Sequence, residues 1–396
     1  HPVNFGVDMN KLKKIDSLIN DAIKNNMTPG AQLLIAKNSN IVYHKAYGYK
    51  TYEKKEKITN NNIYDLASLT KILVSVPLLL NEFMTNDFDL TTKLSEWFPE
   101  KELKNKEDLT VKQLFSHYSG MKSWIPFYKK TIDSITNTRI NKYYSNKKSV
   151  KFPFQVSDDL YIRNYNDTIF NEIINSELSD SLSYVYSDLP YFLLKFYLEK
   201  KYKSSLDKQI KNYLYDKIGS TSLTYKPTNF LDNKLIVPTV VDDYFRFDLV
   251  EGHVHDMGAA MMDGISGHAG LFGNALDIAK ILQLFLQKGS YANEKFFDEK
   301  FFDLFNFRHF EEKKVRRGIG FDKPALDPDD PNTCTCVSDK SFGHYGFTGS
   351  VAWVDPETEI IYVFLSNRTF PDENNNSLSD YNIRTEIQKL VHEAFD

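Results

Sequence analysis

The chain has 396 residues, a formal net charge of −4 and a hydrophobic content of 41%. This hydrophobic content is ordinary for a globular protein and argues against a disordered chain. Acidic and basic residues are mixed along the sequence, so nothing indicates binding to nucleic acid or to an anionic membrane. No apolar run approaches the length of a membrane span. The length favours two lobes over a single core.

The first part of the chain predicts a compact α/β unit. Apolar residues recur at helical spacing over residues 8–25, and a Thr-Pro-Gly break follows. Two strand-like runs, 31–37 and 41–49, are separated by Asn-Ser-Asn, which indicates a hairpin. An apolar helix is then expected to begin near Ser68 and to continue through Leu80.

The middle of the chain changes to helices joined by long polar connections. Short helices are expected over residues 90–98 and 111–115, with Thr110 as the N-cap of the second. Residues 129–150 are rich in Tyr, Asn, Lys and Ser and predict a surface loop or lid. A further helix is expected over residues 190–200.

The end of the chain returns to β-structure. An amphipathic helix is predicted over residues 277–287. Strand-like runs follow at 343–349, 351–355 and 360–366, and a last helix is expected over 378–394. This order predicts an antiparallel sheet whose strands come from both chain ends and are flanked by helices.

These elements predict an α/β (α+β) architecture of two lobes. Residues 1–85 together with 236–396 would form an α/β lobe around the central antiparallel sheet. Residues 86–235 would form an inserted, mainly helical lobe. A cleft between two lobes is a common place for an active site.

Ser68 and Lys71 form a Ser-x-x-Lys motif at the start of the apolar helix. Residues three apart lie on one face of a helix, so the amine can reach the hydroxyl. Free N–H groups in the first helical turn favour developing negative charge. This arrangement can activate a serine without a His–Asp pair. The spacing alone does not decide, because it recurs in the chain. It is also found at Ser119/Lys122, Ser145/Lys148 and Ser205/Lys208.

Two further motifs follow this pair, Tyr186-Ser187-Asp188 and His344-Tyr345-Gly346. The three motifs, in this order and at these distances, resemble those of the serine β-lactamase and penicillin-binding-protein superfamily. The nearest likeness is to its class C β-lactamase, D-aminopeptidase/DD-peptidase and esterase branch, where the motifs read Ser-x-x-Lys, Tyr-x-Asn and Lys/His-x-Gly. The resemblance covers nearly the whole chain and implies a β-lactamase/transpeptidase-like fold.

The chain is also similar to serine hydrolase domains of Bacteroidetes-type bacteria, some of which are fused to family 3 glycosidases. Runs that recur in those domains are Trp124–Tyr128, Gly318–Pro324 and Phe364–Arg368. This likeness implies a fused or partner glycosidase domain and a bacterial envelope location, periplasmic or secreted. The chain begins at His1 rather than Met, so we expect a leader or a preceding domain to have been removed.

The resemblance implies a role for each motif residue. Ser68 would attack a carbonyl and form an acyl-enzyme, while Lys71 and Tyr186 would move the proton. The backbone N–H groups of Ser68 and Phe347 would form an oxyanion hole, worth roughly 3–4 kcal/mol per donor. No metal and no organic cofactor is implied. The expected substrate contacts are Asp188, His344, Gly346 and Trp124.

The general base stays open between Lys71 and Tyr186. Freeing either group from its proton at pH 7 costs roughly 4–5 kcal/mol without help. Burial is expected to lower the pKa of Lys71, and a nearby lysine cation is expected to lower that of Tyr186. Asp188 would keep Lys71 protonated but oppose a Tyr186 phenolate, so its net effect stays open.

Three departures from the family pattern bear on the substrate. Asp188 stands where the β-lactamase pattern has Asn, and an ionised carboxylate has no N–H to donate. His344 stands where Lys is usual, which removes a permanent cation for a substrate carboxylate. Tyr345 is bulkier than the usual small hydroxyl residue. These departures weaken the case for a β-lactamase and for a carboxypeptidase, and favour hydrolysis of an ester or amide.

Two other groups of residues are assigned no chemistry. The run His253–Asp256 resembles a metal-binding sequence, but no second cluster follows at the right spacing. His255 and Asp256, together with His268, are instead expected to pin a loop near the cleft. Cys334 and Cys336 are interpreted as an incidental loop pair, because a Cys-x-Cys disulfide closes a very tight ring.

The predicted function is hydrolysis of an ester or amide in a small or peptidoglycan-derived substrate through an acyl-enzyme. Two alternatives stay open. One is a D-Ala-D-Ala-type peptidase or a β-lactamase of low activity. The other is a non-catalytic ligand-binding domain that partners a glycosidase, which the retention of all three reactive residues argues against.

Overall fold

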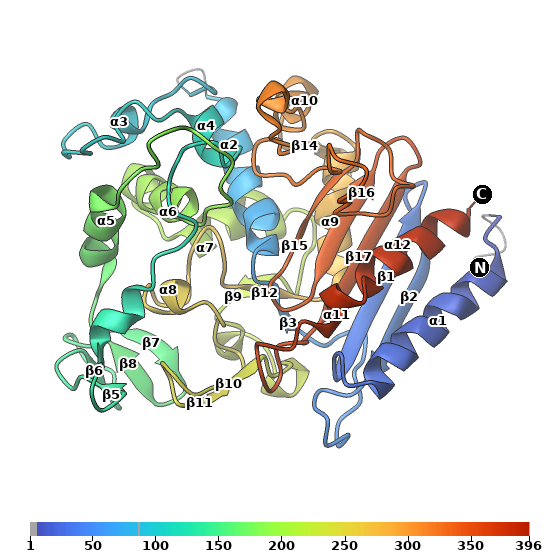
Figure 1. The fold of residues 1–396 in the computed structure, drawn as a ribbon, viewed down its shortest axis with the longest axis horizontal. Helices are drawn as coiled ribbons and strands as arrows, with labels where there is room; N and C mark the ends of the chain where they lie inside the picture. The colour runs from blue at the N-terminus through green and yellow to red at the C-terminus, as the bar shows by residue number, and fades with distance from the viewer. Residues whose placement is uncertain (1–5, 86–87, 396) are drawn as a thin grey trace.

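The computed structural model describes residues 6–85 and 88–395, and its centre is a five-stranded antiparallel sheet in the order β15-β16-β17-β1-β2 (Figure 1). The strands come from both chain ends, and β1 pairs with β17 so that Ala31 lies opposite Ser366. The predicted sheet is therefore confirmed. Its strands are β1 Gly30–Lys37, β2 Asn40–Gly48, β15 Phe342–Tyr345, β16 Val351–Asp355 and β17 Ile360–Ser366.

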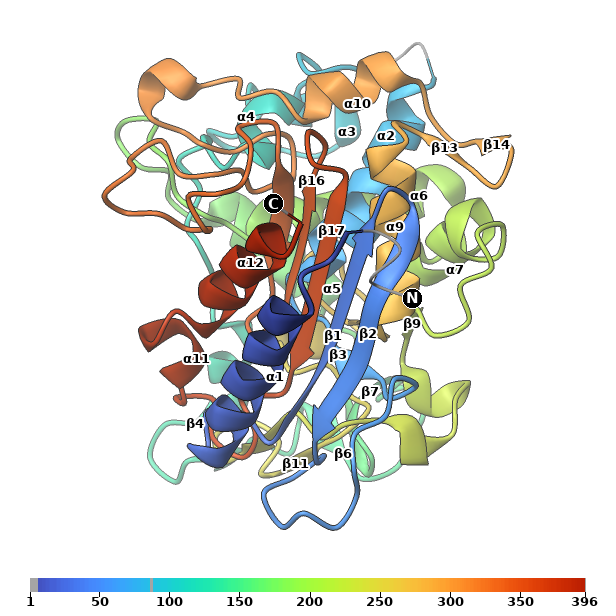
Figure 2. The same cartoon turned by 90° about the vertical axis from the view of Figure 1, so that its right-hand side faces the viewer.

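Helices cover both faces of this sheet. α1 (Met9–Lys24) and α12 (Ile383–Glu393) lie across one face, as Figure 2 shows, and α9 (Ala275–Leu286) packs on the other. Neighbouring residues of β17 alternate between the two layers. Tyr362 packs with α1 and α12, and Val363 packs in the core that includes α9. Because both faces are covered, β16 and β17 are buried along their whole length.

The helix that follows Ser68 runs between the sheet and the helical part of the molecule (Figure 1). It begins as a π-helix, η2 (Lys71–Ser75), and continues as α2 (Val76–Phe83). Every residue of η2 is buried, and so is nearly every residue of α2. A helix that is apolar on all sides belongs in the interior of a protein. The predicted apolar helix is confirmed, and it lies between the five-stranded sheet and the helices from the middle of the chain (Figure 1).

The middle of the chain contains short helices and small sheets. Thr110 caps α4 as predicted, because its hydroxyl accepts the Gln113 N–H while the Gln113 side chain accepts the Thr110 N–H. The predicted loop over residues 129–150 carries three short strands. The assignment of residues 86–235 to a separate lobe stays a prediction. The elements are α3 Leu94–Trp97, α4 Val111–Phe115, η3 Phe127–Thr131, β4 Ile132–Asp133, β5 Thr138–Arg139, β6 Tyr144–Ser145, β7 Phe154–Ser157, β8 Leu160–Ile162, α5 Asn166–Asn175, α6 Leu189–Tyr202, α7 Leu206–Ile210 and η4 Lys211–Tyr215.

Among the remaining elements, a small sheet joins segments that are far apart in the sequence. β12 pairs with both β3 and β9, which places the chain just before Ser68 in a small three-stranded sheet. The elements are β3 Tyr64–Asp65, β9 Thr224–Tyr225, η5 Pro227–Asn229, η6 Asn233–Leu235, β10 Val240–Asp242, β11 Asp248–Val250, α8 Met257–Ala260, β12 Leu271–Gly273, β13 Ser290–Tyr291, β14 Glu294–Lys295, α10 Glu299–Phe305, η7 Glu311–Lys313 and α11 Ser377–Asp380. No helix within residues 6–85 and 88–395 is long and apolar enough to cross a membrane.

Two predicted elements near the C-terminus are wrong in extent. The strand expected over 343–349 ends at Tyr345, because the chain then turns and the Gly346 N–H bonds to the Ser350 carbonyl. The single helix expected over 378–394 is divided into α11 and α12. Asn382 lies between them with a φ of 52°, a left-handed conformation that an α-helix cannot contain.

The two cysteines, expected to be an incidental pair, are bonded to each other. The Cys334–Cys336 disulfide closes a ring within one loop and joins no distant segments. Among the described residues, only Cys334, Cys336 and His392 lie close enough together to hold a metal, and the disulfide leaves neither sulfur atom a thiolate. The run His253–Asp256 is not part of this group.

Candidate active site

Ser68 is presented by a strained turn directly after β3. Ala67 has a φ of 45°, which is uncommon for a residue with a side chain. The buried Asp65 carboxylate holds this turn by accepting the Ala67 N–H at 2.8 Å. The same carboxylate accepts the His255 N–H at 2.7 Å, so it ties the serine turn to the loop before α8.

The structure brings Ser68, Lys71 and Tyr186 together. Lys71 Nζ donates a hydrogen bond to Ser68 Oγ at 2.9 Å, and the Tyr186 hydroxyl donates to the same oxygen at 3.0 Å. Lys71 comes from η2, and Tyr186 lies just before α6, more than a hundred residues along the chain. Both proton-carrying groups predicted from the sequence therefore contact the predicted nucleophile. Their catalytic roles stay predictions.

Lys71 is held as a cation. Its Nζ lies 2.6 Å from Asp188 Oδ1, and 4.9 Å and 5.2 Å from the ring centres of Tyr186 and Tyr191. Burial acts to lower the pKa of Lys71, but Asp188 and then Tyr186 outweigh it, so the pKa lies above its ordinary value. Both expected effects are present, since burial lowers the pKa of Lys71 and Asp188 keeps Lys71 protonated, and the structure shows that the effect of Asp188 prevails.

Tyr186 is held as a neutral phenol. Burial raises the pKa of Tyr186, and the Asp188 carboxylate adds to this, whereas Lys71 and Arg317 oppose it. The expected lowering by a nearby lysine cation is present but does not prevail. In its resting state the site therefore holds two proton donors around Ser68.

His117 supports the second motif, a role that the sequence did not reveal. Its Nδ1 accepts the Ser187 N–H at 3.0 Å, and its ring centre lies 4.7 Å from that of Tyr186. Burial lowers the pKa of His117 well below its ordinary value, and Arg317 and Lys71 add to this, so the ring is neutral. The only indication of this role in the sequence was that His117 follows the helix predicted over residues 111–115.

The third motif needs glycine at its last position. A side chain on Gly346 would place its first carbon 2.8 Å from the Leu66 carbonyl oxygen, so only glycine lets this turn approach the serine turn. Phe347 follows and is half exposed. Among the described residues, no hydrogen-bond acceptor takes the backbone N–H of Ser68 or Phe347. Both N–H groups are thus free to donate to an oxyanion, as the predicted oxyanion hole requires.

His344 is neutral, and a permanent cation lies beside it. Its Nδ1 donates to the Tyr345 carbonyl at 2.7 Å, and its Nε2 accepts from Arg317 Nη1 at 3.0 Å. Burial, then Arg317 and Lys71, lower the pKa of His344 well below its ordinary value. The prediction that position 344 carries no permanent cation is confirmed, but Arg317 supplies one beside it from a distant segment.

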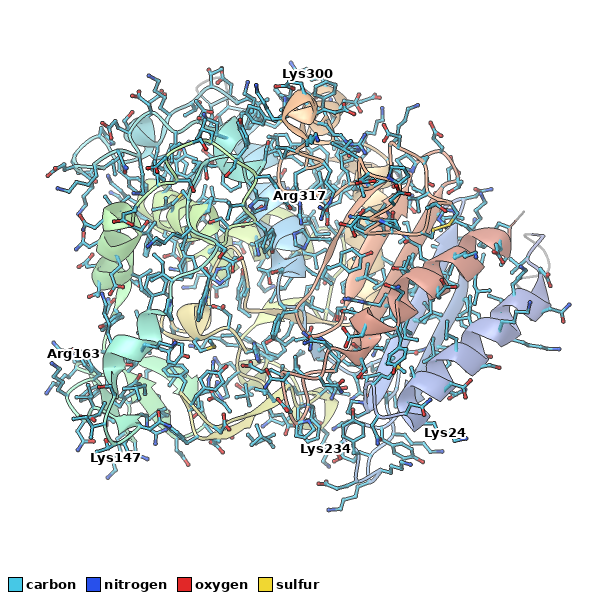
Figure 3. The ribbon with its side chains drawn as sticks, in the orientation of Figure 1. Lys24, Lys147, Arg163, Lys234, Lys300 and Arg317 are labelled. Atoms are coloured by element: carbon cyan, nitrogen blue, oxygen red, sulfur yellow. A yellow bond between two sulfur atoms is a disulfide. The ribbon has the colours of Figure 1, made fainter. Side chains whose placement is uncertain are left out.

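Arg317 belongs to a basic cavity of about 360 Å³ beside Ser68, which we call the arginine cavity. In Figure 3 Arg317 lies in the middle of the view, whereas Arg163 and Lys300 lie at the edges. Asp322 is the one carboxylate of this lining and pairs with Arg316 at 2.7 Å and Arg317 at 3.2 Å. The charged lining residues are Arg316, Arg317, Arg368, Arg384 and Asp322.

A second cavity of about 370 Å³ lies on the other side of Ser68, and we call it the acidic cavity. His268 donates to Asp256 at 2.9 Å, and His255 donates to Glu373 at 2.8 Å. Asp256 also accepts the Ala259 N–H, so the expected pinning of this loop is confirmed. Its lining includes Asp188, Asp256, Glu373, His255, His268 and the predicted substrate contact Trp124.

Asp256 and Glu373 of the acidic cavity stay ionised. Burial acts to raise the pKa of Asp256, but His268 and the Ala259 N–H hold it well below its ordinary value. The hydrogen bond from His255 lowers the pKa of Glu373, against the effect of burial. The arginine cavity is therefore lined mainly by basic groups, whereas carboxylates outnumber imidazoles in the acidic cavity.

Several residues of this site were not predicted from the sequence. Arg317 and its neighbour form a double arginine directly before the run 318–324, and Arg368 closes the run 364–368. Both runs belong to the segments on which the family resemblance rests, so the resemblance could have pointed to these arginines. Arg384 and Glu373 carry no local signal, because only the packing of α12 and the loop after β17 brings them to the cavities.

A buried lysine and a neutral tyrosine on one serine hydroxyl define a class of serine hydrolase that works without a catalytic histidine. The family described as Beta-lactamase matches residues 15–385, and the chain belongs to this family. Its fold is the β-lactamase/transpeptidase-like fold, and it is a serine hydrolase of that family.

Similar proteins of known name span nearly the whole chain. One is an "N-acetylmuramyl-L-alanine amidase" of Bacillus subtilis (strain 168), 29% identical over 92% of this chain and 84% of the relative. Another is a "Putative D-alanyl-D-alanine carboxypeptidase" of Salmonella agona (strain SL483), 26% identical over 93% of this chain and 85% of the relative. Among solved structures, "EstCE1, a hydrolase with promiscuous acyltransferase activity" superposes with a TM-score of 0.66 at 15% identity, covering 96% of this chain and 98% of that one.

Proposed function

We propose that the protein hydrolyses an amide bond in a peptidoglycan-derived substrate through an acyl-enzyme on Ser68. The observation that carries this proposal is that Lys71 Nζ and the Tyr186 hydroxyl both lie within 3.0 Å of Ser68 Oγ. The leaving group carries a carboxylate, which Arg317 binds in the arginine cavity. Arginine suits this contact because its planar fork matches a carboxylate.

The protonation of the site favours an amide over an ester. An amide nitrogen must gain a proton before it can leave, and Tyr186 and Lys71 both hold one in the resting state. The names of the two relatives support this choice, because both describe hydrolysis of an amide bond to alanine. The esterase prediction thus becomes the second candidate.

The proton balance of acylation can be followed in these residues. Lys71 first passes a proton to Asp188, 2.6 Å away, and its free amine then takes the proton of Ser68 as Ser68 Oγ attacks the carbonyl carbon. The C–N bond breaks as Tyr186 gives its proton to the leaving nitrogen. Tyr186 then regains a proton from the Lys71–Asp188 pair, so the proton that Ser68 lost equals the one that the amine gained. Water attacks the acyl-enzyme in the reverse sequence.

The test combines labelling with turnover. Intact mass is measured after incubation with a fluorophosphonate, for the wild type and for Ser68→Ala. We expect one adduct on the wild type and none on the variant. Hydrolysis is then measured with N-acetylmuramyl-L-alanine, a D-alanyl-D-alanine peptide, a p-nitrophenyl ester and a penicillin. We expect at least one of the two amides to be cleaved, with a loss of at least about 10³-fold in Ser68→Ala.

Two results would contradict the proposal. A folded wild type that takes up no fluorophosphonate has no activated serine. Turnover of the ester with neither amide cleaved would favour the second candidate. A bacterial envelope location and a partner glycosidase are proposals that rest on family likeness alone.

A further inference from the structure

Arg368 and Arg384 occupy one part of the arginine cavity and are both held in place by neighbours. Arg368 is 5% exposed, and its Nη1 donates to the carbonyls of Glu373 at 2.9 Å and Asn375 at 2.6 Å. Arg384 Nη2 donates to Ser379 Oγ at 2.7 Å. These contacts fix two guanidinium groups that come from different segments, the loop after β17 and α12.

Aromatic rings cover one face of each guanidinium. Arg368 lies 4.8 Å from the ring centre of Phe347, and Arg384 lies 4.9 Å from that of Tyr345. A stacked guanidinium keeps its edge N–H groups free for a planar partner. Both aromatic residues also line the arginine cavity, so the stacking orients the two cations within it.

Neither of these two arginines has a carboxylate in contact among the described residues, and Glu373 and Asp380 act on Arg368 only from a longer distance. Arg316 and Arg317 share Asp322, whereas neither Arg368 nor Arg384 forms an ion pair with any residue of the described ranges. Burial lowers the pKa of Arg368 to about 10, and the nearby Arg384 contributes. Two cations are thus kept close together and partly buried, which costs stability unless an anion joins them.

We propose that Arg368 and Arg384 form a second anion subsite, separate from Arg317, that binds a second carboxylate of the leaving group. The preferred substrate is then an amide whose leaving group is an acidic peptide with two carboxylates, one at Arg317 and one at the Arg368/Arg384 pair. This inference rests on the proposed function, because it assigns the leaving group to the arginine cavity.

The test uses two substrates that differ in one carboxylate. N-acetylmuramyl-L-alanyl-glutamate has two carboxylates in its leaving group, and N-acetylmuramyl-L-alanyl-glutamine has one. We expect kcat/KM of the wild type to be at least about tenfold higher for the glutamate substrate, since a hydrogen bond to a charged group has at least this effect. In Arg384→Gln the preference should fall to about one, and Arg384→Lys should recover part of it.

Arg163→Gln is the matched control, because Arg163 is exposed and lies at the edge of the molecule (Figure 3). It should keep the wild-type preference. Thermal unfolding and the stoichiometry of fluorophosphonate labelling show whether each variant is folded. Equal kcat/KM for the two substrates in the wild type, or an unchanged preference in a folded Arg384→Gln, would overturn the inference while leaving the proposed function intact.

A binding measurement separates the two failures. If neither amide is cleaved, the proposed function fails, and the subsite is tested by protection of Ser68 from fluorophosphonate. Free alanyl-glutamate should then slow labelling at about tenfold lower concentration than alanyl-glutamine. Equal protection by the two dipeptides would overturn the subsite, and protection that is lost in Arg384→Gln would support it.

Discussion

The two cavities that meet at Ser68 share Tyr186 and Phe347 but differ in charge. The arginine cavity gathers four guanidinium groups around one carboxylate, whereas the acidic cavity gathers three carboxylates and two imidazoles. Phe347 separates them, since its ring packs against His255 on the acidic side and Arg368 on the basic side.

This difference explains how the site can bind a substrate in a single orientation. Ser68 is reached equally by Lys71 and Tyr186 and does not by itself orient the scissile bond. The unequal distribution of charged groups does, because the four arginines attract an anionic leaving group to one cavity, whereas carboxylates line the other. We expect substitutions in the arginine cavity to change turnover of carboxylate substrates far more than those in the acidic cavity.

Arg317→Gln should have the largest effect. It removes the contact to His344 and one of the two partners of Asp322, so we expect a loss of about 10²–10³-fold in kcat/KM for carboxylate-bearing amides. Stability should fall by about 3 kcal/mol, measured by denaturant unfolding. A neutral p-nitrophenyl ester should lose much less turnover than the amide. An equal loss on both substrates would mean that Arg317 only supports the fold.

Asp188→Asn should have the next largest effect. Asp188 lines the acidic cavity, but its carboxylate forms an ion pair with Lys71. We expect kcat to fall by about 10²-fold as the carboxylate that accepts a proton from Lys71 is lost. The wild-type Lys71 has a pKa above its ordinary value, so its charge should not change between pH 6 and 10. In Asp188→Asn that pKa falls, and a new titration should enter the pH–rate profile from the alkaline side.

The same ion pair predicts a pH dependence of stability. A group whose pKa is raised by folding stabilises the protein fully below its unfolded value and loses this effect as the pH rises through the folded value. The wild type keeps this stabilisation up to the ordinary pKa of lysine, so the difference in Tm between wild type and Asp188→Asn should be constant at low pH and should shrink as the pH rises through the lowered pKa of Lys71 in the variant. A variant as active as the wild type, with an unchanged profile, would show that Asp188 takes no part in proton transfer.

Glu373→Gln should have the smallest effect. Glu373 accepts from His255 and Tyr244 at the margin of the acidic cavity, so we expect a change of less than about fivefold in kcat/KM and a loss of about 1 kcal/mol in stability. Its pKa is lowered in the fold, so its contribution is present above its ordinary pKa and is lost as the pH falls through the folded value.

Thermal unfolding of wild type and Glu373→Gln should therefore differ most above pH 5 and converge towards pH 3. The comparison of the two cavities would fail if Glu373→Gln reduced the turnover of carboxylate substrates as strongly as Arg317→Gln. Both cavities would then act as parts of one binding surface.

The sequence by itself determined the local elements and the order of the three motifs. Hydrophobic periodicity is a local property, so α1, β16 and β17 were predicted at or near their observed bounds. The spacing of Ser68 and Lys71 is also local, because three residues along a helix place two side chains on one face. Family likeness then linked Tyr186 and His344 to the same site.

Only the tertiary structure decided the charge of the site. Arg317, Arg384 and Glu373 come from segments that carry no short-range pattern for each other, and packing brings them beside Ser68. The pKa of Lys71 depends on the 2.6 Å approach of Asp188, which outweighs burial. Sequence spacing fixes which groups share a turn of helix, whereas electrostatic effects depend on distance and burial, and these exist only in the folded chain.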